Sequence, residues 1–470
     1  MRWLVVIAAA LCFCPHASAA TLHAGDLVVA AANEGGVIYR VRPVNGEEET
    51  VAQLRDAVVD IGVVMDTEGA IFVAYGETSR TGIVARVNPV KGTVKILTRG
   101  NFLVDPVGIA TARDGDLLVV DAEAFGGAGG IVRVNSRSGL QQTIASAVNF
   151  GQPQNIAVAS NGNLFVTDPT ASGGPAVIRV GITSDLRMND SGTATNPTVL
   201  RVKTTKGAQT IVASGRNLRA PVGIALAATG DLIVSDARAT GTGAIIRIDP
   251  RTGEQRVVCS GGDFGEPQGI TVGQQDDLFV ADRRAFKERG GIIRVNLGSG
   301  TQTAHYPGWR YNDPRSIAIV PASQPDLHIR KGWDFGYYGN DRYNDDGKDQ
   351  TRMQTASAGE TRMFSLRLQN DGKFTDSFVL NGRTRAPGFE LKYFLGGGRE
   401  KELSSDVTAE GEMIHLLRDL APDARQVVRV EITLNNQAKA GTEEAFLFTA
   451  SSVNDRTKRD VVKAIVQVKP

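Results

Sequence analysis

The sequence has few cysteines and no excess of charge of either sign. Only 3 of its 470 residues are cysteines, and two of them, Cys12 and Cys14, lie in an apolar N-terminal segment. The third, Cys259, can form neither an intrachain disulfide nor a cysteine-rich zinc site by itself. With 52 basic against 51 acidic residues, the chain lacks the basic surface that indicates binding to nucleic acid or to an anionic membrane.

Long apolar runs are also missing, except at the N-terminus. Met1 and Arg2 precede an apolar stretch that ends at Cys14, and Ala17-Ser18-Ala19 has the small-x-small pattern of a cleavage site. The stretch is shorter than the about 20 residues that span a bilayer. We therefore expect residues 1–19 to be a signal peptide and the mature chain to be secreted or periplasmic. A retained N-terminal anchor is the alternative.

One strand pattern recurs through the first 320 residues. Its copies are short apolar runs that follow tight polar turns, and they begin at Leu27, Ile71, Leu117, Leu164, Leu232 and Leu278. Most are about 46 residues apart, and one longer interval holds an insertion around residues 181–197. Each unit carries four strand patterns, which is typical of a β-propeller blade. The sequence thus predicts an all-β fold in which residues 20–320 form a six-bladed propeller.

The phase of the repeat predicts how the ring closes. The mature chain begins with a second-strand pattern at Leu27–Ala30, and the last pattern before Pro321 is an unpartnered first strand, Ser316–Val320. We expect these two strands to pair in the first blade, because this removes two open sheet edges.

These residues resemble a known repeat. The segment from Val222 to Asp249, with Val-Gly-Ile-Ala-Leu, Gly-Asp-Leu-Ile-Val-Ser-Asp and Ile-Ile-Arg-Ile-Asp, is similar to the NHL-type repeat of six-bladed propellers related to the SMP-30/gluconolactonase group. The resemblance implies the fold and leaves the activity open, since this fold carries enzymes, receptors and scaffolds.

A second domain follows a short linker at residues 321–325. Residues 326–470 alternate apolar and polar positions in seven or eight short runs separated by turns such as Asn370-Asp371-Gly372. This predicts an immunoglobulin-like sandwich without a disulfide. The same turn, followed by Asp376-Ser377-Phe378, resembles sandwich modules of bacterial exported proteins.

Two polar residues recur within the blades. An aspartate closes four second strands (Asp121, Asp168, Asp236 and Asp282), and an arginine recurs in the third strands (Arg40, Arg86, Arg133, Arg201, Arg247 and Arg294). In blade four the third strand is expected at Val199–Val202, with Arg179 as a second candidate for its arginine. Because a repeated pair is symmetric, we interpret both sets as structural. A ring of arginines around an anion is the alternative.

Enzymes of related shape imply residues that can be checked. Amidating lyases of this fold need several histidine ligands for zinc, but only His305 lies well inside the propeller. Streptogramin-lyase-like propellers depend on one histidine, so His305 would have to act alone. The SMP-30-type lactonases hold a divalent metal through a Glu-Gly-Pro-like motif and channel residues, and here Asn155 is the one match.

Cys259 is expected to be buried, and no metal is assigned. The oxygen-rich loop Asn340–Asp349 could hold calcium, although it lacks the closing glutamate of an EF-hand.

The long, variable loops point to a binding function. They join second to third strands, and fourth strands to the next blade, on one face of the ring, and loops on a rigid scaffold often carry binding residues. The candidate binding residues on this face are Gln154, Asn155, Gln268, Arg283, Trp309, Arg310, Tyr311 and Arg315. The main hypothesis is an exported, non-catalytic binding or scaffold protein for a protein or glycan partner. The alternatives are a metal-dependent hydrolase or lactonase and, with less support, a lyase.

Overall fold

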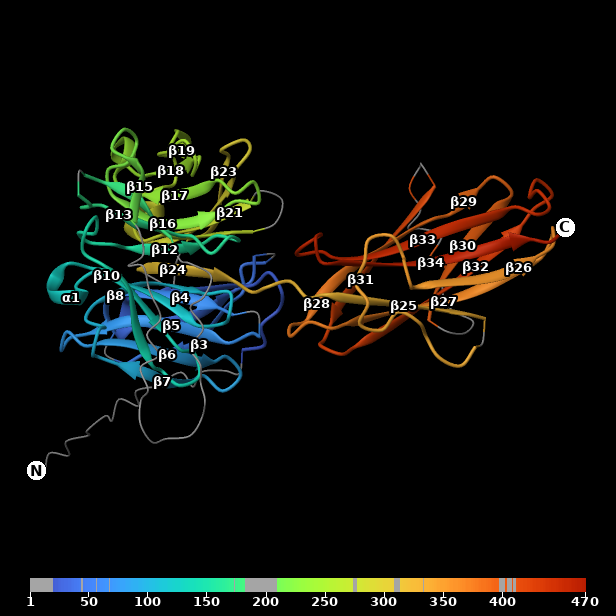
Figure 1. Ribbon diagram of the computed structural model, residues 1–470, viewed down its shortest axis with the longest axis horizontal. Helices are drawn as coiled ribbons and strands as arrows, with labels where there is room; N and C mark the ends of the chain where they lie inside the picture. The colour runs from blue at the N-terminus through green and yellow to red at the C-terminus, as the bar shows by residue number, and fades with distance from the viewer. Residues whose placement is uncertain are drawn as a thin grey trace, which may run out of the picture.

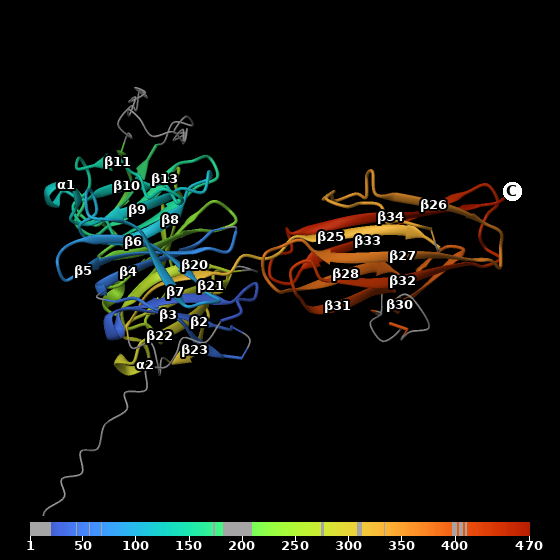
Figure 2. The same cartoon turned by 90° about the horizontal axis from the view of Figure 1, so that it is seen from below.

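The computed structural model describes residues 20–470 except 44, 56, 67, 173, 182–208, 274–276, 308–312, 333, 397–401, 404–407 and 409–410. Within these residues the chain is all-β. Six four-stranded antiparallel sheets, the blades of a propeller, are followed by two five-stranded sheets that form a sandwich-like domain (Figure 1). The two parts lie at opposite ends of an elongated molecule (Figure 2). No helix in the described part of the chain is long and apolar enough to cross a bilayer.

Each blade contributes one strand to the wall of the central channel and three strands further out. The first blade consists of β24 (Pro314–Ile319), β1 (Leu27–Ala31), β2 (Val37–Val41) and β3 (Glu48–Gln53), and the second of β4 (Ala57–Met65), β5 (Ile71–Glu77), β6 (Gly82–Asn88) and β7 (Thr93–Arg99). The third consists of β8 (Pro106–Thr111), β9 (Leu117–Asp121), β10 (Gly130–Val134) and β11 (Gln141–Ser146), and the fourth of β12 (Asn155–Val158), β13 (Leu164–Asp168), β14 (Ala176–Val180) and β15 (Gln209–Ser214). The fifth consists of β16 (Pro221–Leu226), β17 (Leu232–Asp236), β18 (Ala244–Ile248) and β19 (Gln255–Ser260), and the sixth of β20 (Pro267–Val272), β21 (Asp277–Asp282), β22 (Gly291–Asn296) and β23 (Gln302–Pro307). Short helical turns occupy four loops: η1 (Asn33–Gly35), α1 (Ala124–Gly127), η2 (Ala239–Gly241) and α2 (Ala285–Glu288).

The ring closes as the phase of the repeat predicts. Strand β24 pairs antiparallel with β1, with Ile317 opposite Val29. The first blade therefore joins the two ends of the propeller sequence, and the facing edges of both strands are hydrogen-bonded.

The third strand of blade four was misplaced by the sequence interpretation. The structure puts β14 at Ala176–Val180, opposite β13 and β15, so Arg179 is the arginine of this blade. The expected strand Val199–Val202 and Arg201 lie outside the described residues. The insertion thus lies between the third and fourth strands, and both segments have the same Val-x-Arg-Val pattern.

The inner strands of neighbouring blades approach each other closely. A Cβ atom added at Gly108 would lie 2.6 Å from the carbonyl oxygen of Gln154, and one added at Gly269 would lie 2.7 Å from the Cα atom of Ser316. Such contacts leave no room for a side chain, which explains the glycine in the recurrent first-strand pattern. In blade four the equivalent position is Asn155.

The recurrent aspartates are buried hydrogen-bond acceptors. Asp236, which has no exposed surface, accepts the N–H groups of Arg219, Ala220, Arg238 and Ala239 at 2.7–3.0 Å. Equivalent bonds are made by the other three members, which are Asp121, Asp168 and Asp282. Each aspartate fixes the loop that enters its own blade, as a structural role requires.

The third-strand arginines pair within their blades instead of lining the channel. In four blades the partner is the aspartate that precedes or begins the second strand: Arg40 faces Asp26, Arg133 faces Asp116, Arg247 faces Asp231 and Arg294 faces Asp277. In the second blade Arg86 lies over the ring of Phe72, with 5.9 Å between the guanidinium carbon and the ring centroid. These five arginines thus have partners within or next to their own blades, and Arg247 also donates to the Leu297 carbonyl oxygen of the next blade. The anion-site alternative finds no support in these contacts.

The sandwich packs two sheets around an aromatic core. One sheet has the strand order β25 (Pro325–Lys331), β27 (Thr361–Asn370), β32 (Arg425–Leu434), β30 (Phe389–Leu395) and β29 (Arg385–Ala386). The other has β26 (Thr351–Ala356), β34 (Arg459–Val468), β33 (Glu443–Ser452), β28 (Asp376–Arg383) and β31 (Glu412–Leu420). The sequence interpretation missed β25, β26 and the two-residue β29. The core includes the fully buried rings of Phe364, Phe378 and Phe448.

The sandwich contacts the tight-turn face of the propeller. Phe374, from the loop between β27 and β28, packs into a propeller core cluster and lies against Gly69 in the turn after β4. Nearby, the N–H of Ala24 donates to the carbonyl oxygen of Thr375 at 2.9 Å. The linker also joins this contact, because the Ser323 hydroxyl donates to the Phe374 carbonyl oxygen at 2.9 Å.

Candidate functional site

The long-loop face of the propeller is the face that the sandwich leaves open. Its loops include α1, which lies on the side of the ring away from the sandwich (Figure 1). The phenylalanines of these loops pack inward: the ring of Phe125 lies 5.8 Å from that of Phe102, and Phe286 packs against the core of blades five and six. These two aromatic residues therefore hold the loops in place.

Charged side chains gather where the inner strands begin on this face. They come from blades one, two, three and six, and we call them the mouth cluster: Asp60, Asp105, Glu266, Arg283, Asp313 and Arg315. Most of the cluster is joined by ion pairs. Arg315 contacts Asp60 at 3.1 Å and Asp313 at 2.8 Å. Arg283 contacts Asp313 at 3.4 Å and Glu266 at 2.9 Å. The side chain of Arg315 is only 10% exposed, so this part of the cluster is rigid.

Asp105 differs from the rest of the mouth cluster. Its carboxylate makes no ion pair or hydrogen bond with another described residue, and it lies in the field of other acids. Burial, followed by the negative charges of Asp60, Asp121 and Glu123, raises the pKa of Asp105 to about 6. Burial also raises the pKa of Asp60, against the lowering effect of Arg315. The cluster holds four carboxylates against two guanidiniums, so it favours a ligand that brings a positive charge or hydrogen-bond donors.

The repeated aspartates position this site. Asp121 accepts the N–H of Asp105 at 3.1 Å, and Asp282 accepts the N–H of Glu266 at 2.8 Å. The structural repeat thereby fixes the backbone at two members of the mouth cluster, while the side chains at these places differ from blade to blade. A symmetric scaffold in this way carries an asymmetric set of charges.

Below the mouth, most of the residues that line the channel are aliphatic by type, although polar atoms make up much of the exposed lining. A cavity of about 260 Å³ lies between the inner strands, and Asn155 lines it together with Ile109, Ile224, Ile270 and Ser316 among others. The Oδ1 atom of Asn155 accepts the N–H of the next residue, Ile156, at 2.8 Å. No carboxylate or histidine lines this cavity beside Asn155 among the described residues, so the side chains around it offer few ligands for a divalent metal.

The structure brings together some of the predicted binding residues. Arg283 and Arg315 belong to the mouth cluster, and Asn155 lies in the channel. Gln154 and Gln268 lie beside the cluster, but each side-chain amide donates to a carbonyl oxygen of its own loop. Trp309, Arg310 and Tyr311 lie outside the described residues.

The four acids of the mouth cluster are residues that the sequence interpretation missed. Asp105, Glu266 and Asp313 occupy one position, directly before the proline that begins an inner strand, and Asp60 lies one residue further along in its own blade. This position carries no single residue type across the blades. A repeat pattern therefore does not reveal it. The available signal was a charged residue beside the recurrent Pro of the first strands, as in Asp105-Pro106 and Glu266-Pro267.

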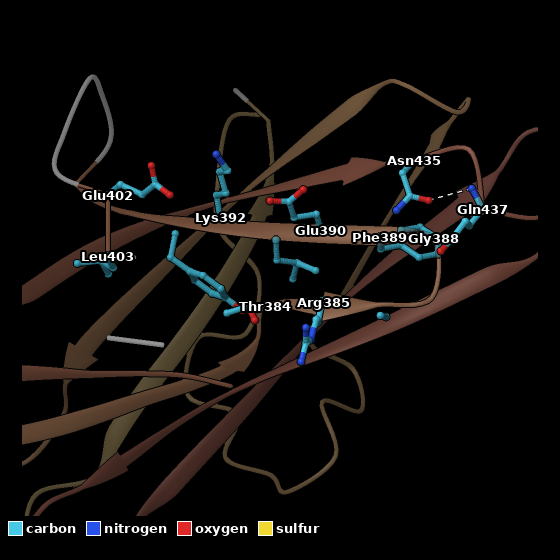
Figure 3. Close-up of a pocket in the computed structure, with 13 residues that line it drawn as sticks. Thr384, Arg385, Gly388, Phe389, Glu390, Lys392, Glu402, Leu403, Asn435 and Gln437 are labelled. Atoms are coloured by element: carbon cyan, nitrogen blue, oxygen red, sulfur yellow. Dashed lines mark hydrogen bonds between the residues drawn. The ribbon is translucent and has the colours of Figure 1, made fainter. Parts of the chain in front are cut away.

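A larger hollow, of about 500 Å³, lies at the sheet edge of the sandwich formed by β29 and β30 (Figure 3). Its lining carries charged side chains of both signs, including Arg385, Lys392 and Glu402. Several polar groups here are engaged within the domain: Asn435 accepts the N–H of Gln437 at 2.9 Å, and the Thr384 hydroxyl donates to a carbonyl oxygen. This hollow is an open groove along an edge strand, and we place the candidate site at the mouth cluster.

Comparison with known proteins finds distant likenesses among solved structures only. No protein-family model matches the chain, and no curated protein is similar to it in sequence. Among solved structures, it is similar to a Bacteroides uniformis protein proposed to be a 6-phosphogluconolactonase, with 13% identity over 64% of this chain and 100% of that one, and a TM-score of 0.43. It is also similar to the periplasmic gluconolactonase of Pseudomonas aeruginosa, with 12% identity over 63% of this chain and 99% of that one, and a TM-score of 0.39. These identities and TM-scores carry no argument about the activity of this chain.

Proposed function

We propose that this chain is an exported, non-catalytic binding protein whose partner docks on the mouth cluster. The observation that carries the proposal is Asp105: a carboxylate without a described protein partner, held by its backbone at the open face of a rigid ring. Unpaired carboxylates of this kind are costly for folding, and a binding role is a reason to keep one.

The chemistry of the cluster defines the partner. Arg283 and Arg315 are neutralised by the acids beside them, whereas Asp105 is available. We therefore infer a protein or glycan outside the cytoplasm that presents an amino group or several hydroxyl groups. The signal-peptide pattern of residues 1–19 and the resemblance of the second domain to immunoglobulin-like modules of exported proteins support this location.

The resemblance of the blades to NHL-type and SMP-30-like propellers is part of the same proposal. It favours a ligand at the channel mouth, because ligands of propellers and other closed scaffolds bind at the loops that the scaffold holds. A metal-dependent lactonase would need further ligands around Asn155, and no carboxylate or histidine is among the described residues that line this cavity.

The test compares two faces of the ring. Partners are captured from envelope and secreted material with the purified mature chain, identified, and then titrated by calorimetry against the wild type, Asp105→Asn and Arg251→Glu. Arg251 is an exposed residue in the tight turn after β18, so it serves as the control on the opposite face. We expect Asp105→Asn to weaken binding at least tenfold, which is about 1.4 kcal/mol, and Arg251→Glu to leave it unchanged.

Two results would overturn the proposal. Equal affinity of the wild type and Asp105→Asn would remove the mouth cluster as the binding site. Hydrolysis of simple sugar lactones in the presence of divalent metals, lost in Asn155→Ala, would show instead that the channel is a catalytic site.

A further inference from the structure

Three carboxylates from separate segments of the sandwich meet near the junction with the propeller. Asp326 lies in β25, Asp341 in the loop that follows it, and Asp371 in the loop after β27. One carboxylate oxygen from each lies within 4.8 Å of those of the other two, and no other group of three or more histidine, cysteine or acidic residues in the described part of the chain comes as close. Like charges at this separation repel one another, and a cation or a proton among them removes the repulsion.

A buried oxygen without a partner points to the same place. The side chain of Asp326 is 1% exposed. Its Oδ2 atom accepts the N–H of Asp341 at 3.2 Å and lies 3.0 Å from Nε2 of His328. Its Oδ1 atom is buried and has no hydrogen-bond partner among the described residues. Buried polar atoms are almost always paired, so this oxygen lacks a group that the protein itself does not provide.

The other two carboxylates are held in position by their neighbours. The Tyr343 hydroxyl donates to Oδ2 of Asp371 at 2.8 Å, and the Asn340 amide donates to Oδ2 of Asp341 at 2.5 Å. Hydrogen bonds of this kind orient the ligands of metal sites. Both ring nitrogens of His328 are engaged, Nε2 by Asp326 and by Oδ1 of Asn340, and Nδ1 by the Arg367 carbonyl oxygen. His328 therefore orients Asp326, and the donor set consists of oxygen alone.

We propose that Asp326, Asp341 and Asp371 form a calcium site. Oxygen donors select a hard cation and disfavour zinc. Calcium takes six to eight oxygens at about 2.3–2.6 Å and tolerates irregular geometry, whereas magnesium requires a compact octahedron with distances of about 2.1 Å. Asp341 is exposed, so water molecules complete the coordination from that side.

The site differs from the one that the loop sequence suggests. Of the acidic residues in Asn340–Asp349, Asp341 alone joins the cluster, while Asp345 pairs with Arg459 instead. The remaining ligands come from β25 and from the Asp371 loop, which also carries Phe374 into the propeller. A bound calcium ion thus ties the start of the sandwich to the loop that anchors it on the ring.

The experiment uses the full mature chain after treatment with a chelator. Calcium chloride is titrated calorimetrically into the wild type, Asp371→Asn, Asp341→Asn and the control Asp346→Asn, an acidic residue of the same loop outside the cluster. Terbium emission excited through tyrosine provides a second readout, because the Tyr343 hydroxyl contacts a proposed ligand. Circular dichroism confirms that each variant is folded, and Asp326→Asn is avoided because its side chain is buried.

We expect one calcium ion per chain with a Kd below about 1 mM, as in extracellular modules, and a loss of at least tenfold in Asp371→Asn and Asp341→Asn. Asp346→Asn should bind as the wild type does. The proposal is wrong if the wild type shows neither heat nor terbium emission up to about 10 mM calcium. It is also wrong if Asp346→Asn weakens binding as much as Asp371→Asn, or if magnesium at the same concentration produces the same response.

Discussion

Neutralising Asp105 is expected to stabilise the propeller while impairing its proposed function. Its carboxyl has a pKa of about 6 in the folded chain, against 3.8 as the ordinary value. Between these two values the folded state binds more protons than the unfolded state, so stability falls as the pH rises from about 4 to 6. Above pH 6 the full penalty is present. Asp105→Asn removes the ionising group and with it the penalty.

The size of the effect follows from the shift. About two pKa units correspond to about 3 kcal/mol, and because the side chain is partly exposed, solvent screening reduces this to about 1–2 kcal/mol. For a domain of this size, such a gain raises Tm by roughly 2–3 °C. Near pH 4 the same substitution should have little effect, since Asp105 is then protonated in the folded state.

The assay is differential scanning calorimetry of the wild type and Asp105→Asn between pH 4 and 8. Asp419→Asn, an exposed aspartate of the sandwich, controls for the loss of one charge. A gain for Asp105→Asn that is the same at pH 4.5 and pH 7.5, or the absence of any gain at pH 7.5, would refute the electrostatic argument and with it the available carboxylate at the mouth.

Three further outcomes follow from the structure. Asp236→Ala leaves four N–H groups without their acceptor and should cost at least about 3 kcal/mol of unfolding free energy, measured by urea denaturation. Asp236→Asn should have an intermediate effect, and a loss below about 1 kcal/mol for Asp236→Ala would contradict the structural role. Burial raises the pKa of Cys259 to about 11. At pH 8 its reaction with a thiol reagent should therefore be about 100-fold slower in the folded chain than in denaturant. Equal rates would show that the thiol is accessible. Phe374→Ala removes the ring that packs on Gly69 and should make residues 321–325 sensitive to proteases while both domains keep their circular dichroism; resistance equal to that of the wild type would show that the ring does not hold the junction.

The fold was predictable where the chain repeats itself. Strand patterns such as Leu232–Asp236 recur in every blade, and the unpartnered strand at Ser316–Val320 was enough to predict how the ring closes. The exception was blade four, where the insertion duplicates the Val-x-Arg-Val pattern and sequence alone could not distinguish Arg179 from Arg201. Repetition thus determines the architecture but becomes ambiguous where a pattern occurs twice.

The candidate site was predictable in its face but not in its chemistry. The loops indicated the open face, and Arg283 and Arg315 were among the candidates. Asp60 and Asp105 were not, because a single acid before a strand looks like any solvated turn residue. What makes Asp105 unusual is the burial and the neighbouring charges that only the closed ring brings together. For the proposed calcium site the sequence indicated the loop Asn340–Asp349, which contains Asp341, but not Asp326 and Asp371, which lie outside that loop and meet Asp341 only in the folded domain.

The path of the chain through β24 has a mechanical consequence. This strand completes the first blade and, a few residues later, continues into β25 of the sandwich. A pulling force on the sandwich is therefore transmitted to the strand that closes the propeller, first through the Phe374 contact and then along the β24–β1 ladder. A force that separates the sandwich from the ring therefore reaches the first blade before it reaches the other five.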